Sequence, residues 1–569
     1  MMMKNINTMN LIEEIKKDTE EIIEKNQVAP ITVEGYQAYI ENGNRLQFER
    51  QYFERRRQLV TLGLALLLDD NNLSNIRMLE KIMWEVCNEY TWALPAHLDY
   101  GGEAAYDRDS PYMVDLFSAE TAQTLSELVE IHGNSFSQIV KSRVESEIER
   151  RVLKPFERKE WEWEHLENNW SAVIASCIGM TALSMLKSQQ ERQEKIIKRL
   201  SISFDSYFRS FENDGVCEEG IGYWIYGFGY YCYFAEKYQQ NYQSDQFLSE
   251  PLLKKIAAFP FYTQIGNRSF VPFSDAENPE LPSGLISFCH RYFQVPVPFL
   301  DQATSLHFDH CYRWAHLSRN LLWTGTVENE QAEGVHYFSD AEWLVANFKE
   351  EKVVFAAKGG SNNESHNHND VGHFIFGSQE ELLLTDLGAG EYTRGYFLEE
   401  TRYSILNNRS LGHSVPIING CEQIAGDHQA EKVEFTESAD GFRFSMNLEG
   451  VYGKESQITD YHRKWQWVKD EKMLFLQDEI HFNRNMNNKV LQNFISHYQP
   501  LIQENKISWK GEKCQVDLFF SDKLDEARTI REEYRTHQGD IREVYRLVLS
   551  AKKLTNNYKR KYKLQVKEN

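Results

Sequence analysis

Paired cysteines, long apolar runs and a leader-like start are all missing from this chain of 569 residues. Its eight cysteines are scattered without a CxxC pair, several within apolar helical patterns, which indicates buried free thiols and a reducing compartment rather than a disulfide framework. No stretch approaches the roughly 18 apolar residues of a membrane span. The N-terminal stretch 1–26 has no apolar core of signal-peptide length, so we expect a cytoplasmic protein unless a leader has been removed.

Basic residues are also fewer than acidic residues. The 63 Lys and Arg residues stand against 85 Asp and Glu residues, which gives a formal net charge of -22. A field of this sign argues against binding of nucleic acid. An anionic substrate held in a local basic cleft is still compatible with it, and no membrane partner is expected.

Apolar and aromatic residues are plentiful. Hydrophobic residues make up 41% of the chain and aromatic residues 13%, which suffices for large packed cores. A chain of this length is too long for one core, so two or more domains are expected. Flat aromatic faces also line carbohydrate clefts, although we expect most of these rings in the cores.

The first part of the chain has helical periodicity. Apolar residues recur at steps of three and four, which gives each segment one apolar stripe. The segments with such stripes are 55–68, 76–86, 114–131, 134–153, 170–187, 191–211, 222–237 and 307–323. The pattern loosens between 240 and 300. Many successive amphipathic helices predict helix pairs in a toroid or solenoid, and the lack of a fixed-period repeat argues against a regular array.

After about residue 325 the pattern changes to short apolar runs separated by turn residues. Several runs alternate apolar and polar residues, as 442–446 do, which is typical of strands. No long helices intervene, so a β-sandwich is favoured over βαβ units. We therefore predict a multidomain α+β protein with a helical domain at 1–325 and a sandwich at 326–569. The basic tail 559–567 is predicted to be a solvated segment or the last strand.

A dense group of histidines and carboxylates lies within 365–420. His366 and His368 alternate with asparagines, and alternation in an extended chain places both side chains on one face, so both can point into one cavity. Asp386 ends an apolar run, and His413 lies in a Gly-His-Ser turn. Imidazole and carboxylate together are common zinc ligands. Each histidine alone is more simply a solvated loop residue, whereas the set as a whole favours a metal site.

Three stretches of the helical part also carry candidate functional residues. They are WALPAHLD at 92–99, ENNW at 167–170 and DGVCEEGIGYWIYGFGYY at 214–231. Glycines in the last stretch permit close approach of a ligand, and tyrosine hydroxyls can transfer protons. One of the two asparagines of ENNW is expected to be a helix N-cap, and Tyr230 and Tyr231 are expected in the core.

Together these stretches resemble the heparinase II/III-like polysaccharide lyases over most of the chain. The resemblance is sharpest in SHNHNDVGHF, LLLTDLGAGEYT and RSLGHSVPIING, and in the order DG…GYW…YG. It implies an incomplete (α/α) toroid followed by an antiparallel β-sandwich. It also implies β-elimination on an anionic polysaccharide or oligosaccharide that contains uronic acid. The expected substrates are of the glycosaminoglycan type: heparin or heparan sulfate, chondroitin or dermatan, or hyaluronan.

The resemblance implies roles for single residues. Tyr223 matches the proton donor, which in some members is also the base, and His366 matches the catalytic histidine. Asn169 matches the group that binds the substrate carboxylate, although the neighbouring Trp170 stands where some relatives have histidine. The implied ligands of a structural or site-organising Zn²⁺ are His368, Asp386 and His413. Further candidates for substrate contacts are Asn168, Trp170, His97, Trp224, Arg394 and Arg409, with a surface salt bridge as the alternative for each arginine.

These residue types suit the chemistry of elimination. The C5 proton of a uronate is weakly acidic because the ionised carboxylate resists further negative charge, and a donor such as Asn169 relieves that charge. A base must take the C5 proton and an acid must protonate O4. If both protons lie on one face of the sugar, Tyr223 can serve both steps; otherwise His366 is the base. This division expects a metal at His368 but not at His366.

Three other functions stay open at this stage. The chain can be a lyase for another uronate polymer or oligosaccharide such as alginate or ulvan. It can also be a toroid glycoside hydrolase with Glu218 and Glu219 as acids. A third alternative is a carbohydrate-binding protein without turnover. The polymer, the mode of cleavage and the oligomeric state are not predicted.

Overall fold

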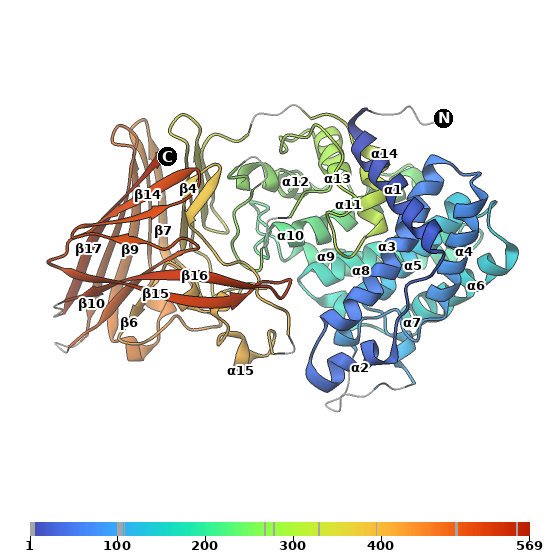
Figure 1. Cartoon of the computed structure of the whole chain (residues 1–569), viewed down its shortest axis with the longest axis horizontal. Helices are drawn as coiled ribbons and strands as arrows, with labels where there is room; N and C mark the ends of the chain where they lie inside the picture. Colours follow the sequence, from blue (N-terminus) through green and yellow to red (C-terminus); the bar gives the residue numbers. More distant parts are fainter. Residues whose placement is uncertain are drawn as a thin grey trace. The chain divides into compact units, whose positions relative to one another are not determined.

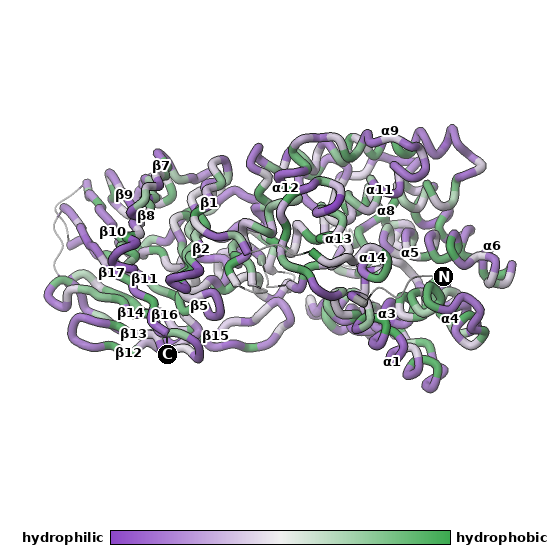
Figure 2. The backbone as a smooth tube through the Cα atoms, turned by 90° about the horizontal axis from the view of Figure 1, so that it is seen from above, coloured by the Kyte–Doolittle hydropathy of each residue, from purple (hydrophilic) through white to green (hydrophobic). Residues whose placement is uncertain are grey.

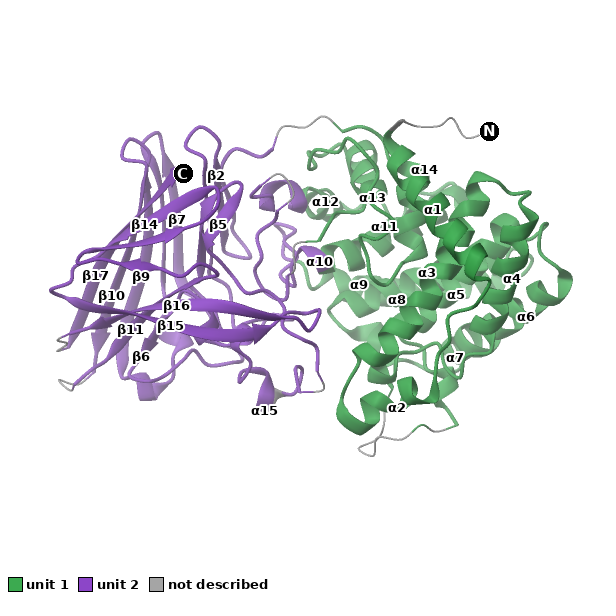
Figure 3. Cartoon of the chain, in the orientation of Figure 1, with its two compact units in different colours: residues 1–211, 223–258, 279–330 green, residues 212–222, 259–278, 331–569 purple. Residues whose placement is uncertain are grey.

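The chain folds into two compact units that do not divide at one point of the sequence (Figure 3). The computed structural model describes residues 6–98, 106, 108–266, 269–276, 279–327, 331–393, 395–483, 487–552 and 556–568. Unit 1 comprises 1–211, 223–258 and 279–330. Unit 2 comprises 331–569 together with two short segments, 212–222 and 259–278, that lie within the helical part of the sequence. The expected boundary at 325/326 falls close to the last of these crossings.

Unit 1 is built of helices, drawn in blue to green in Figure 1. Neighbours pack in pairs, such as α3 with α4, α5 with α8, α8 with α9 and α11, and α13 with α14. The helices are α1 (Met9–Lys25), α2 (Val33–Asn42), α3 (Leu46–Leu68), α4 (Leu73–Cys87), α5 (Leu116–His132), α6 (Gln138–Ile148), α7 (Lys154–Arg158), α8 (Asn169–Met185), α9 (Gln190–Phe208), α11 (Gly229–Tyr242), α13 (Ser283–Phe288) and α14 (Trp314–Trp323). Each predicted apolar stripe overlaps one of these helices, although 149–153 and 224–228 are π-helical turns and 307–313 precedes α14.

A buried ion pair links α5 to α14 inside unit 1. Glu127 accepts hydrogen bonds from Arg319 Nη1 at 2.7 Å and Nη2 at 2.9 Å, and from Trp314 Nε1 at 2.8 Å. Burial raises the pKa of Glu127, but Arg319 and Lys237 outweigh it and lower the pKa to about 2. The carboxylate is therefore ionised at neutral pH and compensates a buried guanidinium.

Unit 2 contains three antiparallel sheets. The first, in order, is β1 (Gly334–Phe338), β2 (Trp343–Phe348), β3 (Val353–Lys358), β4 (Phe374–Ser378) and β5 (Glu381–Leu384). The second is β12 (Leu501–Ile502), β13 (Lys506–Lys510), β14 (Cys514–Phe519), β17 (Asn557–Glu568), β10 (Met473–Phe482), β9 (Ile458–Val468), β8 (Gly441–Asn447) and β7 (Glu431–Ser438). The third is β15 (Asp525–Arg535), β16 (Ile541–Ala551), β11 (Val490–Ser496) and β6 (Pro416–Ile418).

The sheets enclose one large core, as expected for a sandwich. Along β9, Tyr461, Arg463, Trp465 and Trp467 are buried while the residues between them are partly exposed, which is the period of two that a half-buried strand needs. Phe355 of β3 packs against Trp465, so the first and second sheets share this core. The edge strand β15 is hydrophilic and largely purple in Figure 2.

Two parts of the chain that the sequence left open have regular structure, and for the basic tail the last-strand alternative holds. The region 240–300 contains the helices α12 (Leu252–Thr263) and α13 as well as loops, and Pro260 inside α12 explains why its pattern was weak. The basic tail is a strand, β17, which lies between β14 and β10 in the eight-stranded sheet. All eight cysteines are free, and among the described residues no helix is long and apolar enough to cross a membrane.

Candidate functional site

The histidines of 365–374 lie in a loop of unit 2, between β3 and β4, and not in a strand. The expectation of an extended chain at His366 and His368 is therefore wrong. His366 has a φ of +55°, in the left-handed region, which few residues other than glycine adopt. Both imidazoles nevertheless contact the same side chain, because the turn at His366 brings them together. Alternation along a strand is not the cause.

That shared group is the carboxylate of Asp275. Its Oδ2 lies 2.9 Å from His366 Nδ1, and its Oδ1 lies 3.0 Å from His368 Nε2. Burial raises the pKa of Asp275, but the hydrogen bonds from both histidines outweigh it and hold the pKa well below its usual range. The ionised carboxylate can only accept, so both ring nitrogens are donors.

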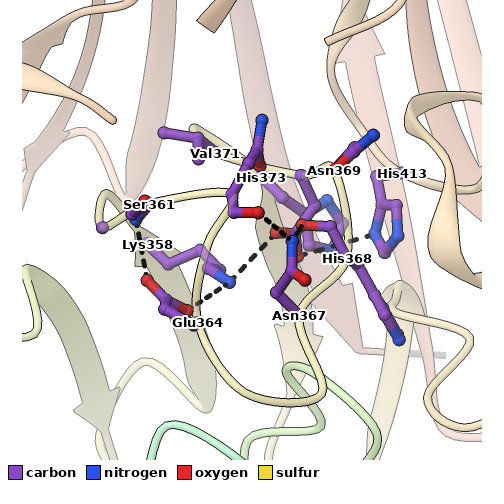
Figure 4. Close-up of polar contacts among 12 residues, drawn as sticks. Lys358, Ser361, Glu364, Asn367, His368, Asn369, Val371, His373 and His413 are labelled. Carbon is purple, nitrogen blue, oxygen red and sulfur yellow. Dashed lines mark hydrogen bonds and ion pairs between the residues drawn. The ribbon is translucent and has the colours of Figure 1, made fainter. Parts of the chain in front are cut away.

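A second group on the far side of His368 has the composition of a metal site. His368, Asp370, Asp386 and His413 are all buried, and one ligand atom from each lies within 4.8 Å of the others. Figure 4 shows His368 and His413 side by side in this cluster. His366 is not a member of it. The three residues expected as zinc ligands are therefore brought together, and Asp370 joins them as a fourth.

Hydrogen bonds fix the ring orientation of both histidine ligands. His368 Nε2 donates to Asp275, and His413 Nε2 donates to the carbonyl of Asn407 at 2.8 Å. Each ring then carries its lone pair on Nδ1, and neither Nδ1 atom makes a hydrogen bond. An imidazole whose other nitrogen is held by an acceptor is the usual arrangement of a metal ligand.

The electrostatics of the cluster call for a cation. His413 Nδ1 lies 3.4 Å from Asp386 Oδ2 and 3.9 Å from Asp370 Oδ2, so a lone pair faces two carboxylates. Burial lowers the pKa of His413, but Asp386 and Asp370 outweigh it and raise the pKa. Either a proton or a metal ion relieves the repulsion. Two imidazoles and two carboxylates are a donor set that Zn²⁺ accepts, so the residues present fit the implied metal.

Lys358 lies next to the carboxylate of Asp370, and His373 lies next to that of Asp386. Lys358 is fully buried, and its Nζ lies 3.0 Å from Asp370 Oδ1 and 3.5 Å from Glu364 Oε2 (Figure 4). His373 Nδ1 accepts from the backbone N–H of Ser414 at 2.9 Å, so its proton is on Nε2, 3.2 Å from Asp386 Oδ2. His373 Nε2 is thus within ion-pair distance of Asp386 without hydrogen-bond geometry, and His373 is not a member of the candidate metal group.

The sheet anchors the loops that carry the cluster. Arg463 of β9 is fully buried and makes a bidentate ion pair with Asp478, with Nε–Oδ1 at 2.7 Å and Nη2–Oδ2 at 2.9 Å. Its remaining Nη1 donates to the carbonyls of Gly372 at 2.8 Å and Ser414 at 3.0 Å. One side chain therefore fixes the backbone next to both Asp370 and His413.

In unit 1, the asparagines of ENNW divide their roles. Asn168 is the N-cap of α8 and accepts from the N–H of Trp170 at 3.0 Å, which accounts for it structurally. Asn169 is 4% exposed, and its Oδ1 makes no hydrogen bond within the described structure. An unsatisfied buried amide is costly, and a ligand can satisfy it.

Two of the expected substrate contacts lie against each other in the same unit. The rings of His97 and Trp170 are 4.9 Å apart, and both side chains are partly exposed. His97 Nδ1 lies 2.8 Å from Asp115 Oδ2, and Asp115 also caps α5. The turn at 92–98 and the start of α8 therefore form one polar and aromatic surface.

Tyr223 is partly exposed and ends the short helix α10 (Ile221–Tyr223), directly before a π-helical turn, Trp224–Phe228. Such turns are frequent at functional sites. Trp224, expected among the substrate contacts, is fully buried, and its Nε1 donates to the carbonyl of Ile256 at 2.7 Å. It lies in the core, in ring contact with Phe228, and is not exposed as a substrate contact must be.

Two arginines near the motifs, Arg394 and Arg409, were candidates for substrate contacts. Arg409 is paired with Glu422, whose two oxygens lie 3.1 and 3.0 Å from its Nε, so the salt-bridge alternative holds. Arg394 lies outside the described residues.

Several functional candidates were not found from the sequence. The orientation of the rings and the charge balance of the site depend on Asp275, Lys358 and His373. Asp275 lies in an irregular loop, 91 residues before its partner His366. Asp370 and His373 stood inside a recognised motif, and their short spacing to His368 was the one sign available.

Solved structures with the same architecture cover nearly the whole chain. A heparinase III structure matches with a TM-score of 0.64 at 13% identity, over 99% of this chain and 92% of its own. The chain has a heparinase-like lyase fold. A heparan sulfate lyase from Pedobacter heparinus matches with a TM-score of 0.63 at 10% identity, over 97% of this chain and 83% of its own.

A chondroitin AC lyase from Streptomyces coelicolor A3, in complex with chondroitin sulphate, shares the heparinase-like fold with a TM-score of 0.57 at 8% identity, over 99% of this chain and 80% of its own. The expected architecture, a helical toroid followed by an antiparallel β-sandwich, is therefore confirmed. No protein-family model matches the sequence, and no curated protein matches it.

Proposed function

We propose that this chain is a polysaccharide lyase that cleaves uronic-acid-containing polysaccharides of the glycosaminoglycan type by β-elimination. The observation that carries the proposal is the hydrogen bond from His366 Nδ1 to the buried carboxylate of Asp275. It fixes an imidazole with its lone pair on Nε2, which is the form that a general base needs. The heparinase-like fold, which heparan sulfate and chondroitin lyases share, supports the choice of reaction and substrate class.

In this proposal His366 Nε2 takes the C5 proton of the uronate. The electron pair of the C5–H bond forms the C4–C5 double bond, and the C4–O4 bond breaks. Tyr223 donates its hydroxyl proton to O4, so that a new chain end and an unsaturated uronyl end are released. Where the C5 proton and O4 lie on one face of the sugar, Tyr223 takes both steps.

In this proposal Asn169 neutralises the negative charge of the substrate carboxylate. The enolate-like charge that develops when the C5 proton leaves spreads over that carboxylate, so a fixed amide donor stabilises the transition state more than the bound substrate. The carboxylate contact falls to Nδ2 of Asn169, whereas its Oδ1, which lacks a partner within the described structure, can accept from a sugar hydroxyl. His97 and Trp170 supply the adjoining sugar-binding surface.

A zinc ion at His368, Asp370, Asp386 and His413 would hold these loops together and compensate two buried carboxylates. The protein residues supply the rest of the arrangement. His373 and Lys358 orient Asp386 and Asp370, and Asp275 orients His368. In this proposal the metal organises the site, and His366 and Tyr223 transfer the protons.

Hydrolysis by Glu218 and Glu219 is the weaker alternative. A glycosidase needs one carboxylic acid and one ionised carboxylate. Burial raises the pKa of Glu218 to about 9, helped by Glu364, and burial also raises the pKa of Glu219. Both pKa values are thus shifted in the same direction, whereas a glycosidase pair needs them pushed apart.

The test is a screen of purified glycosaminoglycans, alginate and ulvan, read by the ultraviolet absorbance of the unsaturated uronyl product. Elimination forms that chromophore and hydrolysis does not. Absorbance that grows on one or more glycosaminoglycans supports the proposal. New reducing ends without absorbance indicate a hydrolase. Activity on alginate or ulvan alone would show that the substrate is not a glycosaminoglycan but another uronate polymer.

A further inference from the structure

Asp275 joins the two halves of the candidate site in unit 2. We propose that it is a positioning residue that sets the tautomers of His366 and His368 at once, and so couples the general base to the metal site. The inference rests on the proposed function for its base half, and on the ligand assignment of His368 for its metal half. Its side chain is fully buried, as is that of His368.

The geometry of the three side chains is specific. The two oxygens of Asp275 serve different rings and contact opposite nitrogens: Nδ1 of His366 at 2.9 Å and Nε2 of His368 at 3.0 Å. Because a carboxylate only accepts, the proton of His366 is on Nδ1 and that of His368 is on Nε2. The lone pairs are then on His366 Nε2, for a substrate proton, and on His368 Nδ1, for a metal.

Further donors surround the carboxylate and keep it ionised and fixed. The hydroxyl of Tyr396 lies 2.5 Å from Oδ1, the hydroxyl of Tyr392 lies 3.1 Å from Oδ2, and Arg402 Nη2 lies 3.7 Å from Oδ2. These groups occupy its remaining acceptor positions. A carboxylate held by so many donors does not rotate to favour one histidine over the other.

The backbone next to Asp275 is held as closely. A Cβ on Gly388, which has a φ of +60°, would lie 2.1 Å from the carbonyl oxygen of Ala276. A Cβ on Gly220, with a φ of +103°, would lie 2.9 Å from Cβ of Ala276. Both positions require glycine. The loop of Asp275 is thus pressed against the loop that carries the ligand Asp386.

The coupling runs in both directions. A hydrogen bond from a ligating imidazole to a carboxylate strengthens the ligand, and the same carboxylate stabilises the imidazolium that His366 becomes when it takes a proton. Replacement of the carboxylate by an amide leaves one oxygen acceptor and one NH₂ donor. One of the two rings must then flip its tautomer or lose its partner.

The test compares Asp275→Asn with the wild-type chain. Zinc affinity is measured by competition with a chromogenic chelator, and kcat and KM are measured separately on the best substrate. We expect zinc binding weaker by about 10- to 100-fold. We also expect a kcat lower by roughly 10²- to 10⁴-fold, as for a base with the wrong tautomer, with KM nearly unchanged.

Two variants separate the halves. His366→Ala removes the base and should leave zinc affinity as in the wild type, whereas His368→Ala should abolish zinc binding. Asp275→Asn with unchanged zinc affinity would overturn the coupling, and so would a rise in KM with kcat unchanged. A loss of zinc affinity in a chain that has no lyase activity on any polymer would overturn the proposed function and leave the metal half standing.

A measurement on the wild-type chain covers the case in which Asp275→Asn does not fold. Nitrogen-15 spectra of histidine-labelled protein, assigned with His366→Ala and His368→Ala, report which ring nitrogen is protonated. We expect Nδ1–H for His366 and Nε2–H for His368. The opposite tautomer at either ring would contradict the inference.

Discussion

His373 and Asp386 face each other inside unit 2, with His373 Nε2 3.2 Å from Asp386 Oδ2. The backbone N–H of Ser414 donates to Nδ1 of His373, so the ring proton is on Nε2, the nitrogen that lies near the carboxylate. Burial raises the pKa of Asp386, but His413 and His373 outweigh it and hold the pKa well below its usual range. Asp386 is therefore an ionised, buried carboxylate that can serve as a metal ligand, which leads to the first prediction.

Protein purified without chelator should contain about one zinc or similar divalent ion per chain. Asp386→Asn should lose it, because the amide cannot replace the ionised ligand. Metal analysis and the melting temperature measured with and without a strong chelator provide the readouts. Binding at 100 times Kd adds about 2.7 kcal/mol of stability, so chelation should lower the melting temperature of the wild type.

The matched control for the metal site is His481→Ala, which removes an exposed histidine on β10. It should keep both the metal and the response to chelator. Full activity in a chain that contains no metal would reduce the four ligands to a hydrogen-bonded cluster.

Tyr223→Phe should lower the rate of elimination by about 10²- to 10⁴-fold or more, because the group that protonates O4 is removed. Tyr230→Phe is its control in the same stretch. Tyr230 is fully buried and its hydroxyl makes no hydrogen bond within the described structure, so its loss should be neutral or slightly stabilising. Initial rates and melting temperatures of both variants decide. Near-normal turnover in Tyr223→Phe excludes it as the acid.

His366→Ala should impair elimination on at least one uronate epimer, since the base is needed where the C5 proton and O4 lie on opposite faces. Rates on substrates rich in glucuronate and in iduronate provide the comparison. Metal content should stay at the wild-type value because His366 is not part of the ligand group. Equal rates of variant and wild type on both epimers would reject His366 as a base.

Glu127→Gln should destabilise unit 1 by about 3–5 kcal/mol, since it leaves the buried Arg319 without its counter-charge. The folded pKa of Glu127 is about 2, below the ordinary value of 4.5. Its contribution is therefore fully present above pH 4.5 and is lost as the pH falls from 4.5 toward 2. Denaturant unfolding at pH 7 and at acidic pH measures both. The variant should lack this part of the acid loss, and a variant as stable as the wild type at pH 7 would contradict the account.

Periodicity was enough to predict the order of helices and strands. The stripe at 170–187 became α8, and the alternation at 442–446 became part of β8. Residues such as Trp465 and Phe355 could not be paired in advance, because sheet packing is decided by contacts between distant strands. Nor could the placement of 212–222 and 259–278 in unit 2 be predicted, since these segments have no pattern that differs from their neighbours.

The proximity of His368, Asp386 and His413 was predicted because these residues are concentrated in recognisable motifs, and their binding of a metal stays a prediction. Asp275 was not predicted, because its role arises from a loop held by glycines far along the chain. Proximity to the motifs predicts substrate contacts for Trp224 and Arg409, with a surface salt bridge as the alternative for Arg409. The structure gives Trp224 a core position and Arg409 an ion-pair partner, Glu422, and neither could be inferred without the packing.

The central claim, that the chain is a β-eliminating lyase, is tested most directly by one experiment. Purified protein is incubated with heparan sulfate, chondroitin sulfate and hyaluronan, and ultraviolet absorbance of unsaturated uronate is followed against Tyr223→Phe as the blank. The account predicts absorbance that grows with wild-type enzyme on at least one of these polymers and not with the variant. Depolymerisation without that absorbance, or equal absorbance from both proteins, would contradict it.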